Sequence, residues 1–192
     1  MRIVFCGVGA LGSTSAVLCR NLDATLVFID FDRVESKNLL AQAYVKQSVG
    51  KNKAEALKLQ LLNFHGVKAE SFGVRLTTEN VATLCKDAGL LIDCFDNAAS
   101  RKLLSDHARA SGTPLLHAAV SGDGTFGLVR WDENFVPDAE DVAGQATCEG
   151  GEHLPLLGLL CGAIARTVQD FVKAGVRRDS MVGLAAVTPT TR

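Results

Sequence analysis

The sequence predicts one doubly wound α/β domain, in which a mostly parallel sheet carries helices on both faces. Short apolar runs alternate along the chain with longer stretches of helical period, which is the pattern of successive β-α-β units. The first apolar run also ends in a glycine-rich turn that leads directly into a helix. At 192 residues, the chain has the length of one such domain.

The individual elements follow from these runs in order. Compact apolar runs, the second typical of a strand buried on both faces, predict strands at 2–8 and 25–30. Further strands are predicted at 67–72, 90–95, 114–120 and 125–131. Helical periods predict helices at 11–21, 51–63, 78–86, 98–110 and 154–173. No period is visible after residue 175. We therefore place the domain at 1–175 and a C-terminal tail, without a predicted element, at 176–192.

Composition excludes several classes of protein. The chain has 20 Lys and Arg against 21 Asp and Glu, so it lacks the basic surplus of a nucleic-acid-binding protein. No apolar run approaches the ~20 residues of a membrane span, and the first residues lack the layout of a signal peptide. The six cysteines contain no CxxC pair and suit reduced thiols. We expect a cytoplasmic protein without nucleic-acid or membrane partners.

A GxGxxG motif, formed by Gly7, Gly9 and Gly12, joins the first predicted strand to the first helix. In this context glycines allow the tight turn, the approach of a phosphate and close packing of helix and strand. Asp30 ends the second predicted strand, where an acid can accept hydrogen bonds from ribose hydroxyls. These residues predict nucleotide binding but do not distinguish NAD, FAD and ATP. The alternative is that the glycines serve only the turn.

Further motifs follow Asp30. They are D-F-D-x-V-x-x-x-N-L-x-x-Q, G-x-x-K-x-E-A and D-x-x-D-N-x-x-x-R, in that order. With them, the chain resembles the ThiF/MoeB/HesA and ubiquitin-activating-enzyme-like superfamily, in its short ThiF-like form. The resemblance implies a Rossmann-like fold, ATP and Mg²⁺ as cofactors, and a homodimer. It also implies adenylation of the C-terminal glycine of a ubiquitin-like or sulfur-carrier protein, which some members then transfer to a thiol.

The resemblance also implies a set of site residues. Asp30 would hold the ribose, Lys53 would lie along the phosphates, and Asp96 would be the Mg²⁺ ligand. The implied nucleotide-binding residues are Gly7, Gly9, Gly12, Asp30, Asp32, Asn38, Gln42, Lys53, Asp96 and Asn97, and the candidate catalytic residues are Asp96, Lys53 and Cys148. Alternatives remain open, since Lys53 can be a surface residue, the Asp96–Asn97 pair can merely cap a helix, and Arg101 can be a structural ion-pair residue.

Cys148 precedes the last predicted helix, at a place where members of this superfamily can carry a reactive thiol. A helix N-terminus would lower the pKa of that thiol, whereas Glu149 and Glu152 act in the opposite direction. Both a catalytic and a bystander role therefore stay open. The other five cysteines fall in apolar or helical patterns that are typical of packing residues, and His117 fits a hydrogen-bonded core histidine better than a metal ligand.

The chain also departs from the superfamily pattern. Ala41 stands where members usually have an arginine that contacts ATP phosphates. We also expect no N-terminal helix to deliver a second arginine across a dimer, and no zinc, because the paired CxxC motifs are absent. The loss of two cations favours, as an alternative function, a degenerate member that binds a nucleotide or a partner without chemistry. An NAD(P)-dependent oxidoreductase is a further alternative, which leaves Asn38 and Lys53 without a role.

Overall fold

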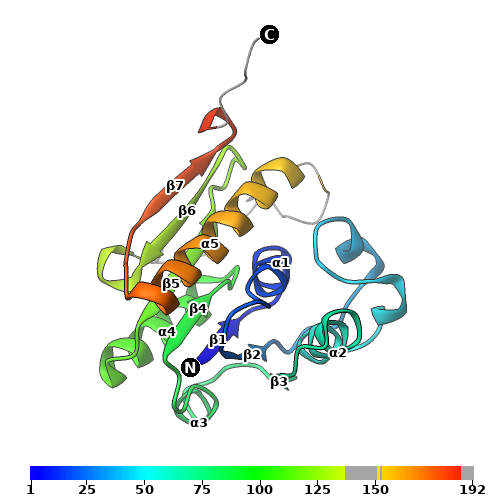
Figure 1. Cartoon of the computed structure of the whole chain (residues 1–192), viewed down its shortest axis with the longest axis horizontal. Helices are drawn as coiled ribbons and strands as arrows, with labels where there is room; N and C mark the ends of the chain where they lie inside the picture. Colours follow the sequence, from blue (N-terminus) through cyan, green and yellow to red (C-terminus); the bar gives the residue numbers. More distant parts are fainter. Residues whose placement is uncertain (137–150, 152, 187–192) are drawn as a thin grey trace.

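The computed structural model describes residues 1–136, 151 and 153–186, and within them the strands form one sheet of order β3-β2-β1-β4-β5-β6-β7 (Figure 1). Strands β1 to β5 are parallel, whereas β6 pairs antiparallel with β5 and with β7. The sheet confirms the predicted α/β class. The strands are β1 (Arg2–Cys6), β2 (Thr25–Ile29), β3 (Ala69–Phe72), β4 (Leu90–Asp93), β5 (Leu115–Val120), β6 (Phe126–Trp131) and β7 (Ser180–Gly183).

Helices cover both faces of this sheet, as the doubly wound pattern predicts. One face carries α1 (Ala10–Leu18), α2 (Lys53–His65) and α5 (Leu154–Ala174), and the other carries α3 (Val81–Leu84) and α4 (Ala98–Ser111) (Figure 1). Short 3₁₀ turns complete the described chain, namely η1 (Ser36–Leu40), η2 (Lys46–Ser48), η3 (Asp132–Asn134) and η4 (Leu184–Ala186).

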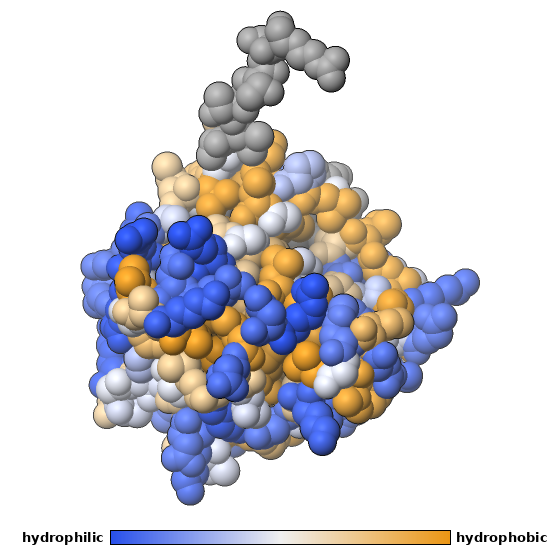
Figure 2. Space-filling model, viewed as in Figure 1, coloured by the Kyte–Doolittle hydropathy of each residue, from blue (hydrophilic) through white to orange (hydrophobic). Residues whose placement is uncertain are grey.

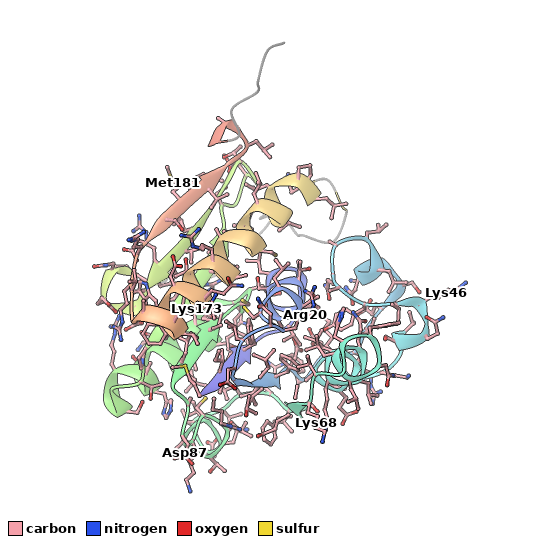
Figure 3. All side chains as sticks on the ribbon, viewed as in Figure 1. Arg20, Lys46, Lys68, Asp87, Lys173 and Met181 are labelled. Carbon is pink, nitrogen blue, oxygen red and sulfur yellow. The ribbon has the colours of Figure 1, made fainter. Side chains whose placement is uncertain are left out.

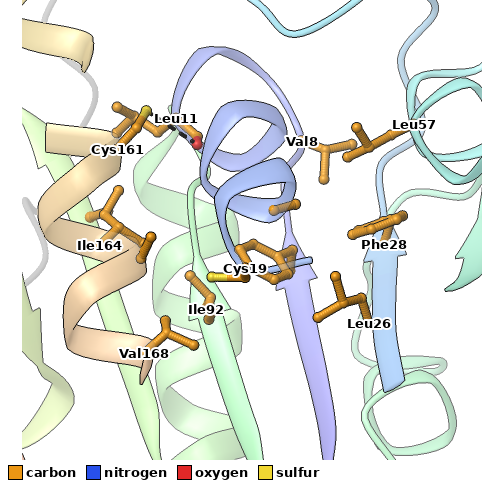
Figure 4. Packing of buried hydrophobic residues seen from close by; sticks show 14 of the residues in the cluster. Val8, Leu11, Cys19, Leu26, Phe28, Leu57, Ile92, Cys161, Ile164 and Val168 are labelled. Carbon is orange, nitrogen blue, oxygen red and sulfur yellow. Dashed lines mark hydrogen bonds between the residues drawn. The ribbon is translucent and has the colours of Figure 1, made fainter. Parts of the chain in front are cut away.

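Two apolar clusters, one on each face, hold these layers together. The larger one joins the sheet to α1, α2 and α5, and it includes Phe28, Leu57 and Ile164 (Figure 4). There the Cys161 thiol lies 3.6 Å from the carbonyl oxygen of Leu11, which marks the close contact of α5 with α1. Burial of this area is the main stabilising contribution to the fold.

The structure differs from the sequence prediction at three elements. The helix predicted at 78–86 is reduced to α3, and the polar stretch at 31–49 contains the 3₁₀ turns η1 and η2. Strand β7 lies beyond residue 175, where no element was predicted. Its four residues are too few to show a period along the sequence. In the structure they pair antiparallel with the edge of β6.

Helix α5 is long and apolar enough to cross a membrane by length and composition alone, contrary to the expectation that no run approaches this length. In the structure 44% of its most apolar window is buried, and its inner side packs on α1 and β6. Apolar surface is visible around the start of α5 in Figure 2, where Leu154 is 43% exposed. Charged side chains elsewhere are exposed, among them Arg20, Lys46 and Lys173, which are labelled in Figure 3.

Candidate functional site

The glycine loop lies at the carboxyl end of β1, in the middle of the sheet. A Cβ added at Gly7 would lie 2.9 Å from the carbonyl oxygen of Cys94, and one added at Gly12 would lie 2.0 Å from that of Gly7. A Cβ at Gly9 would meet nothing within 4 Å. Gly9 is the N-cap of α1 and no side chain caps it, so the helix N-terminus is open to an anion.

Asp30 ties the end of β2 to this loop. One carboxylate oxygen of Asp30 accepts a hydrogen bond from the Val8 amide at 2.8 Å, and the other accepts one from the Asp32 amide at 2.9 Å. Burial raises the pKa of Asp30 above its ordinary value, although the two amides and nearby Lys53 act in the opposite direction. Lys53 is itself 8% exposed, and its Nζ lies 3.2 Å from Oδ2 of Asp32. Lys53 is therefore a buried residue of the site.

Two hydroxyl groups fasten the loop after β2 to the glycine loop. Tyr44 donates a hydrogen bond to the carbonyl oxygen of Val8 at 2.6 Å. Ser13 donates to the carbonyl oxygen of Gly9 at 2.6 Å and accepts from the Ala43 amide at 3.0 Å. Burial raises the pKa of Tyr44 well above its ordinary value, so this phenol is a neutral donor.

The turn at 38–42 carries two further predicted residues. Asn38 is buried and its Oδ1 accepts a hydrogen bond from the Glu35 amide, so this side chain holds the turn. Gln42 lines a cavity of about 230 Å³ between this turn and the starts of α1 and α5, with Ala10 and Ala41 also in its wall. Within the described ranges, the buried Oε1 of Gln42 has no hydrogen-bond partner.

Asp96 and Asn97 follow β4, on the other side of the glycine loop from Asp30. Asn97 caps α4 by accepting a hydrogen bond from the Ser100 amide at 2.9 Å, whereas Asp96 is exposed. The capping role thus falls to Asn97 and leaves the Asp96 carboxylate facing solvent. Because strands β2, β1 and β4 are neighbours, the chain reverses its direction of winding here, which is where doubly wound proteins bind ligands.

Arg101 and His117 both contact groups of the sheet and of the segments beside it. Arg101 lies 3.0 Å from Oδ2 of Asp93 in an ion pair and also donates to the carbonyl oxygen of Ala118 at 2.9 Å. The His117 ring is fully buried and hydrogen-bonds to Asp93 and Asp132. His117 is thus a satisfied core histidine, as the sequence analysis predicted.

The described cysteines are packing residues, as predicted. Cys6, Cys19, Cys85 and Cys161 are buried and Cys94 is half-buried, and none of them forms a disulfide. Burial raises the pKa of Cys19 to about 12. The remaining candidate, Cys148, lies outside the described residues.

Sequence reasoning missed several residues that build the site. Asn52 donates to the carbonyl oxygens of Asp30 and Asp32, and the only signal for it was its place just before Lys53 in the G-x-x-K motif. Arg75 stacks on Phe31 with its guanidinium carbon 3.8 Å from the ring centre. No sequence spacing indicates that pair, because β3 brings Arg75 beside the end of β2 only in the folded sheet.

The fold and its glycine loop are of the Rossmann-like type, and comparison with known proteins gives the family. The ThiF family matches residues 1–166, and this chain belongs to it. The chain is 34% identical over 132 residues to the sulfur carrier protein ThiS adenylyltransferase of Bacillus subtilis, covering 66% of this chain and 39% of that protein. It is 31% identical over 170 residues to the adenylyltransferase and sulfurtransferase UBA4 of Meyerozyma guilliermondii, covering 83% and 40% respectively.

The crystal structure of Escherichia coli MccB with MccA-N7isoASN shows the same fold. Its TM-score is 0.75 at 17% sequence identity, over 92% of this chain and 58% of that one. This chain spans about 40% of the length of the curated relatives it matches.

Proposed function

We propose that this chain is an ATP-dependent adenylyltransferase that activates the C-terminal glycine carboxylate of a ubiquitin-like or sulfur-carrier protein. One observation carries the proposal. The open N-terminus of α1 at Gly9 lies between Asp30, after β2, and Asp96, after β4, with Lys53 buried against the first of these loops. An anion site flanked by one acid for a ribose and another for a cation suits Mg²⁺·ATP. The names of the two matched relatives support the same activity.

The residues of the site would have different roles in such a reaction. Asp30 accepts hydrogen bonds from the ribose, and the first amides of α1 hold the phosphates. A carboxylate oxygen of the carrier attacks the α-phosphorus of ATP, the bond from that phosphorus to the bridging oxygen breaks, and pyrophosphate leaves. The carboxylate is ionised at neutral pH, so the reaction needs no general base.

Asp96 fits the role of a Mg²⁺ ligand. Among the described residues no three His, Cys, Asp or Glu side chains cluster as a complete metal site. Mg²⁺, however, commonly binds through one or two carboxylates together with substrate phosphates, which a single exposed Asp96 allows. When bound, the ion would neutralise charge on the phosphates, and Lys53 would add a second cation once it leaves Asp32.

Binding without chemistry is the second candidate function. It is favoured by Ala41, which lines the cavity beside the start of α1 with a methyl group in place of a cation. By the resemblance we also propose a homodimer, which light scattering after size-exclusion chromatography tests.

The experiment is a titration of the purified protein with ATP·Mg²⁺ and with NAD⁺, followed by ATP–pyrophosphate exchange with a carrier that ends in Gly-Gly. We expect a preference for ATP, which Asp96→Asn weakens only when Mg²⁺ is present. The matched control is Asp106→Asn, since Asp106 is an exposed acid on the next helix that pairs with Lys102. Binding of ATP without exchange would favour the second function, and preference for NAD⁺ would overturn the proposed adenylyltransferase.

A further inference from the structure

A cluster of buried charged side chains lies behind the loop that carries Asp96. It joins Asp93 at the end of β4, Arg101 in α4, His117 in β5 and Asp132 in η3, and Arg109 completes it at the surface. Asp93 and His117 are fully buried and Asp132 is 7% exposed. Buried charges are costly even when paired, and an apolar core of the same shape is often at least as stable. The cluster therefore calls for a role beyond stability.

His117 is the bridge of this cluster. Its Nδ1 lies 2.7 Å from Oδ2 of Asp93, and its Nε2 lies 2.9 Å from Oδ1 of Asp132. The Phe135 ring stacks on the imidazole, with the ring centres 4.1 Å apart and the planes at 13°. The ring is thus fixed on its face and at both nitrogens.

Both carboxylates act as acceptors from charged groups. Oδ2 of Asp93 also accepts from Arg101, and Oδ2 of Asp132 accepts from Arg109 at 2.6 Å. Burial raises the pKa of Asp132, but hydrogen bonds from Arg109, Ser105 and His117 act more strongly in the opposite direction. The pKa of Asp132 is therefore below its ordinary value. Each ring nitrogen of His117 therefore faces a carboxylate that also accepts from an arginine.

The same cluster fixes the peptide that leads into Asp96. The second oxygen of Asp93 accepts a hydrogen bond from the Phe95 amide at 2.9 Å. The carbonyl oxygen of Phe95, which belongs to the peptide bond joining it to Asp96, accepts from Arg101. On its other side this turn touches the glycine loop, because a Cβ at Gly7 would lie 3.2 Å from the Phe95 ring. The position of Asp96 relative to that loop therefore depends on Asp93 and Arg101.

We propose that His117 is a positioning residue for Asp96. By holding Asp93 against the Phe95 amide and Arg101, it sets the direction in which the Asp96 carboxylate meets Mg²⁺·ATP at the glycine loop. The inference rests on the proposed function for its ligand, but the arrangement of the loop is a property of the chain itself and is testable without a nucleotide.

The test compares His117→Gln with wild type in two measurements. The first measurement is ATP binding as a function of Mg²⁺ concentration, which gives the concentration needed for half of the Mg²⁺-dependent effect. The affinity for ATP without Mg²⁺ is measured in parallel. We expect the Mg²⁺ requirement to rise about tenfold, the size typical of lost support behind a metal ligand, while Mg²⁺-free affinity changes less than about twofold. The second is amide hydrogen exchange at Phe95, Asp96 and Asn97 in the free protein, which we expect to accelerate.

Two further variants keep the proposal open to refutation. Arg101→Lys keeps the charge but cannot reach Asp93 and the Phe95 carbonyl together, so it should reproduce the effect if His117→Gln does not fold. Lys102→Gln removes a charge from the exposed side of α4, where Lys102 pairs with Asp106 outside the cluster. It is the control, expected to leave Asp96 exchange and the Mg²⁺ requirement unchanged.

Unchanged exchange at Asp96 in both His117→Gln and Arg101→Lys would overturn the proposal. So would an equal loss of ATP affinity with and without Mg²⁺, because that is the signature of a merely structural role. If wild type does not bind ATP·Mg²⁺, the proposed function is refuted, and the exchange measurement alone decides whether His117 positions the loop.

Discussion

At the scale of single residues, the three glycines of the loop have different surroundings and hence different roles. Gly7 and Gly12 lie where any Cβ would collide with backbone, and Gly7 also has a φ of +83°. Gly9 faces open space. The first and third glycines are therefore required by the fold, and only the second leaves room for a ligand to approach the backbone.

This difference predicts opposite results for two matched substitutions. Gly12→Ala should lower the free energy of unfolding by about 2 kcal/mol or more, because backbone must shift to admit the methyl group. Gly9→Ala should change it by less than about 0.5 kcal/mol, yet weaken ATP binding by obstructing the phosphate. Urea unfolding and an ATP titration on both variants check this, and normal ATP affinity in Gly9→Ala would show that phosphate does not approach there.

The residues of the site divide clearly into those that sequence could predict and those that it could not. Gly9 and Asp30 are set by local spacing around one strand-turn-helix unit, so a motif reveals them. The pairing of His117 with Asp93 and Asp132 depends on which strands become neighbours, and no spacing along the chain expresses that. The role of Asn97 as the cap of α4, rather than Asp96, likewise required the fold.

At the scale of elements, the start of α2 holds the loops that follow β2 and β3 in place. Asn52 caps the helix by accepting from the Glu55 amide at 3.1 Å, and its Nδ2 donates to the carbonyl oxygens of Asp30 at 2.8 Å and Asp32 at 3.1 Å. A Cβ at Gly73 would lie 2.9 Å from the same side chain. The side-chain amide of Asn52 thus connects α2 with the loops that follow β2 and β3.

Asn52→Ala should therefore cost both stability and binding. We expect a loss of about 1–2 kcal/mol in the free energy of unfolding, the usual range for a lost cap, together with weaker ATP binding because the Asp30 loop is released. Asn80→Ala is the control, since Asn80 makes similar local bonds to Thr77 and Arg75 at the start of α3. Denaturant unfolding and ATP titration measure both effects, and equal ATP affinity in the two variants would refute the connection.

The elements that sequence predicted best are those whose ends carry local signals. Helix α2 ends at Gly66 and α4 at Gly112, both with left-handed backbone, and a polar Asn caps the start of each. The helix predicted at 78–86 was too long because α3 packs only Val81, Leu84 and Cys85 beneath the sheet. Turns such as η1 have no period to detect, since they are held by individual bonds such as that from the Glu35 amide to Asn38.

At the scale of the whole molecule, the sheet continues past the boundary expected from sequence. Strand β7 covers the free edge of β6, and just before it Asp179 accepts hydrogen bonds from the Trp131 amide at 3.0 Å and from Asn134 at 2.9 Å. Residues 176–186 are therefore built into the domain.

A pair of truncations tests this arrangement. A chain that ends after residue 175 should melt several degrees lower than the full chain and aggregate more readily, because β6 becomes an uncovered edge. A chain that ends after residue 186 keeps β7 and should behave like the full chain. Thermal unfolding with light scattering reports both, and equal melting temperatures for the two truncations would show that β7 contributes nothing.

The central place of β1 in the sheet also has a consequence for biosynthesis. Its first partner, β2, leaves the ribosome soon after it, but its second, β4, lies roughly 90 residues further along the chain. At about 5–20 residues per second, β1 waits several seconds with one edge unpaired. Its residues Ile3 to Cys6 are all fully buried in the finished protein. Until β4 has been synthesised, this apolar strand keeps an unpaired edge, which exposes the nascent chain to aggregation.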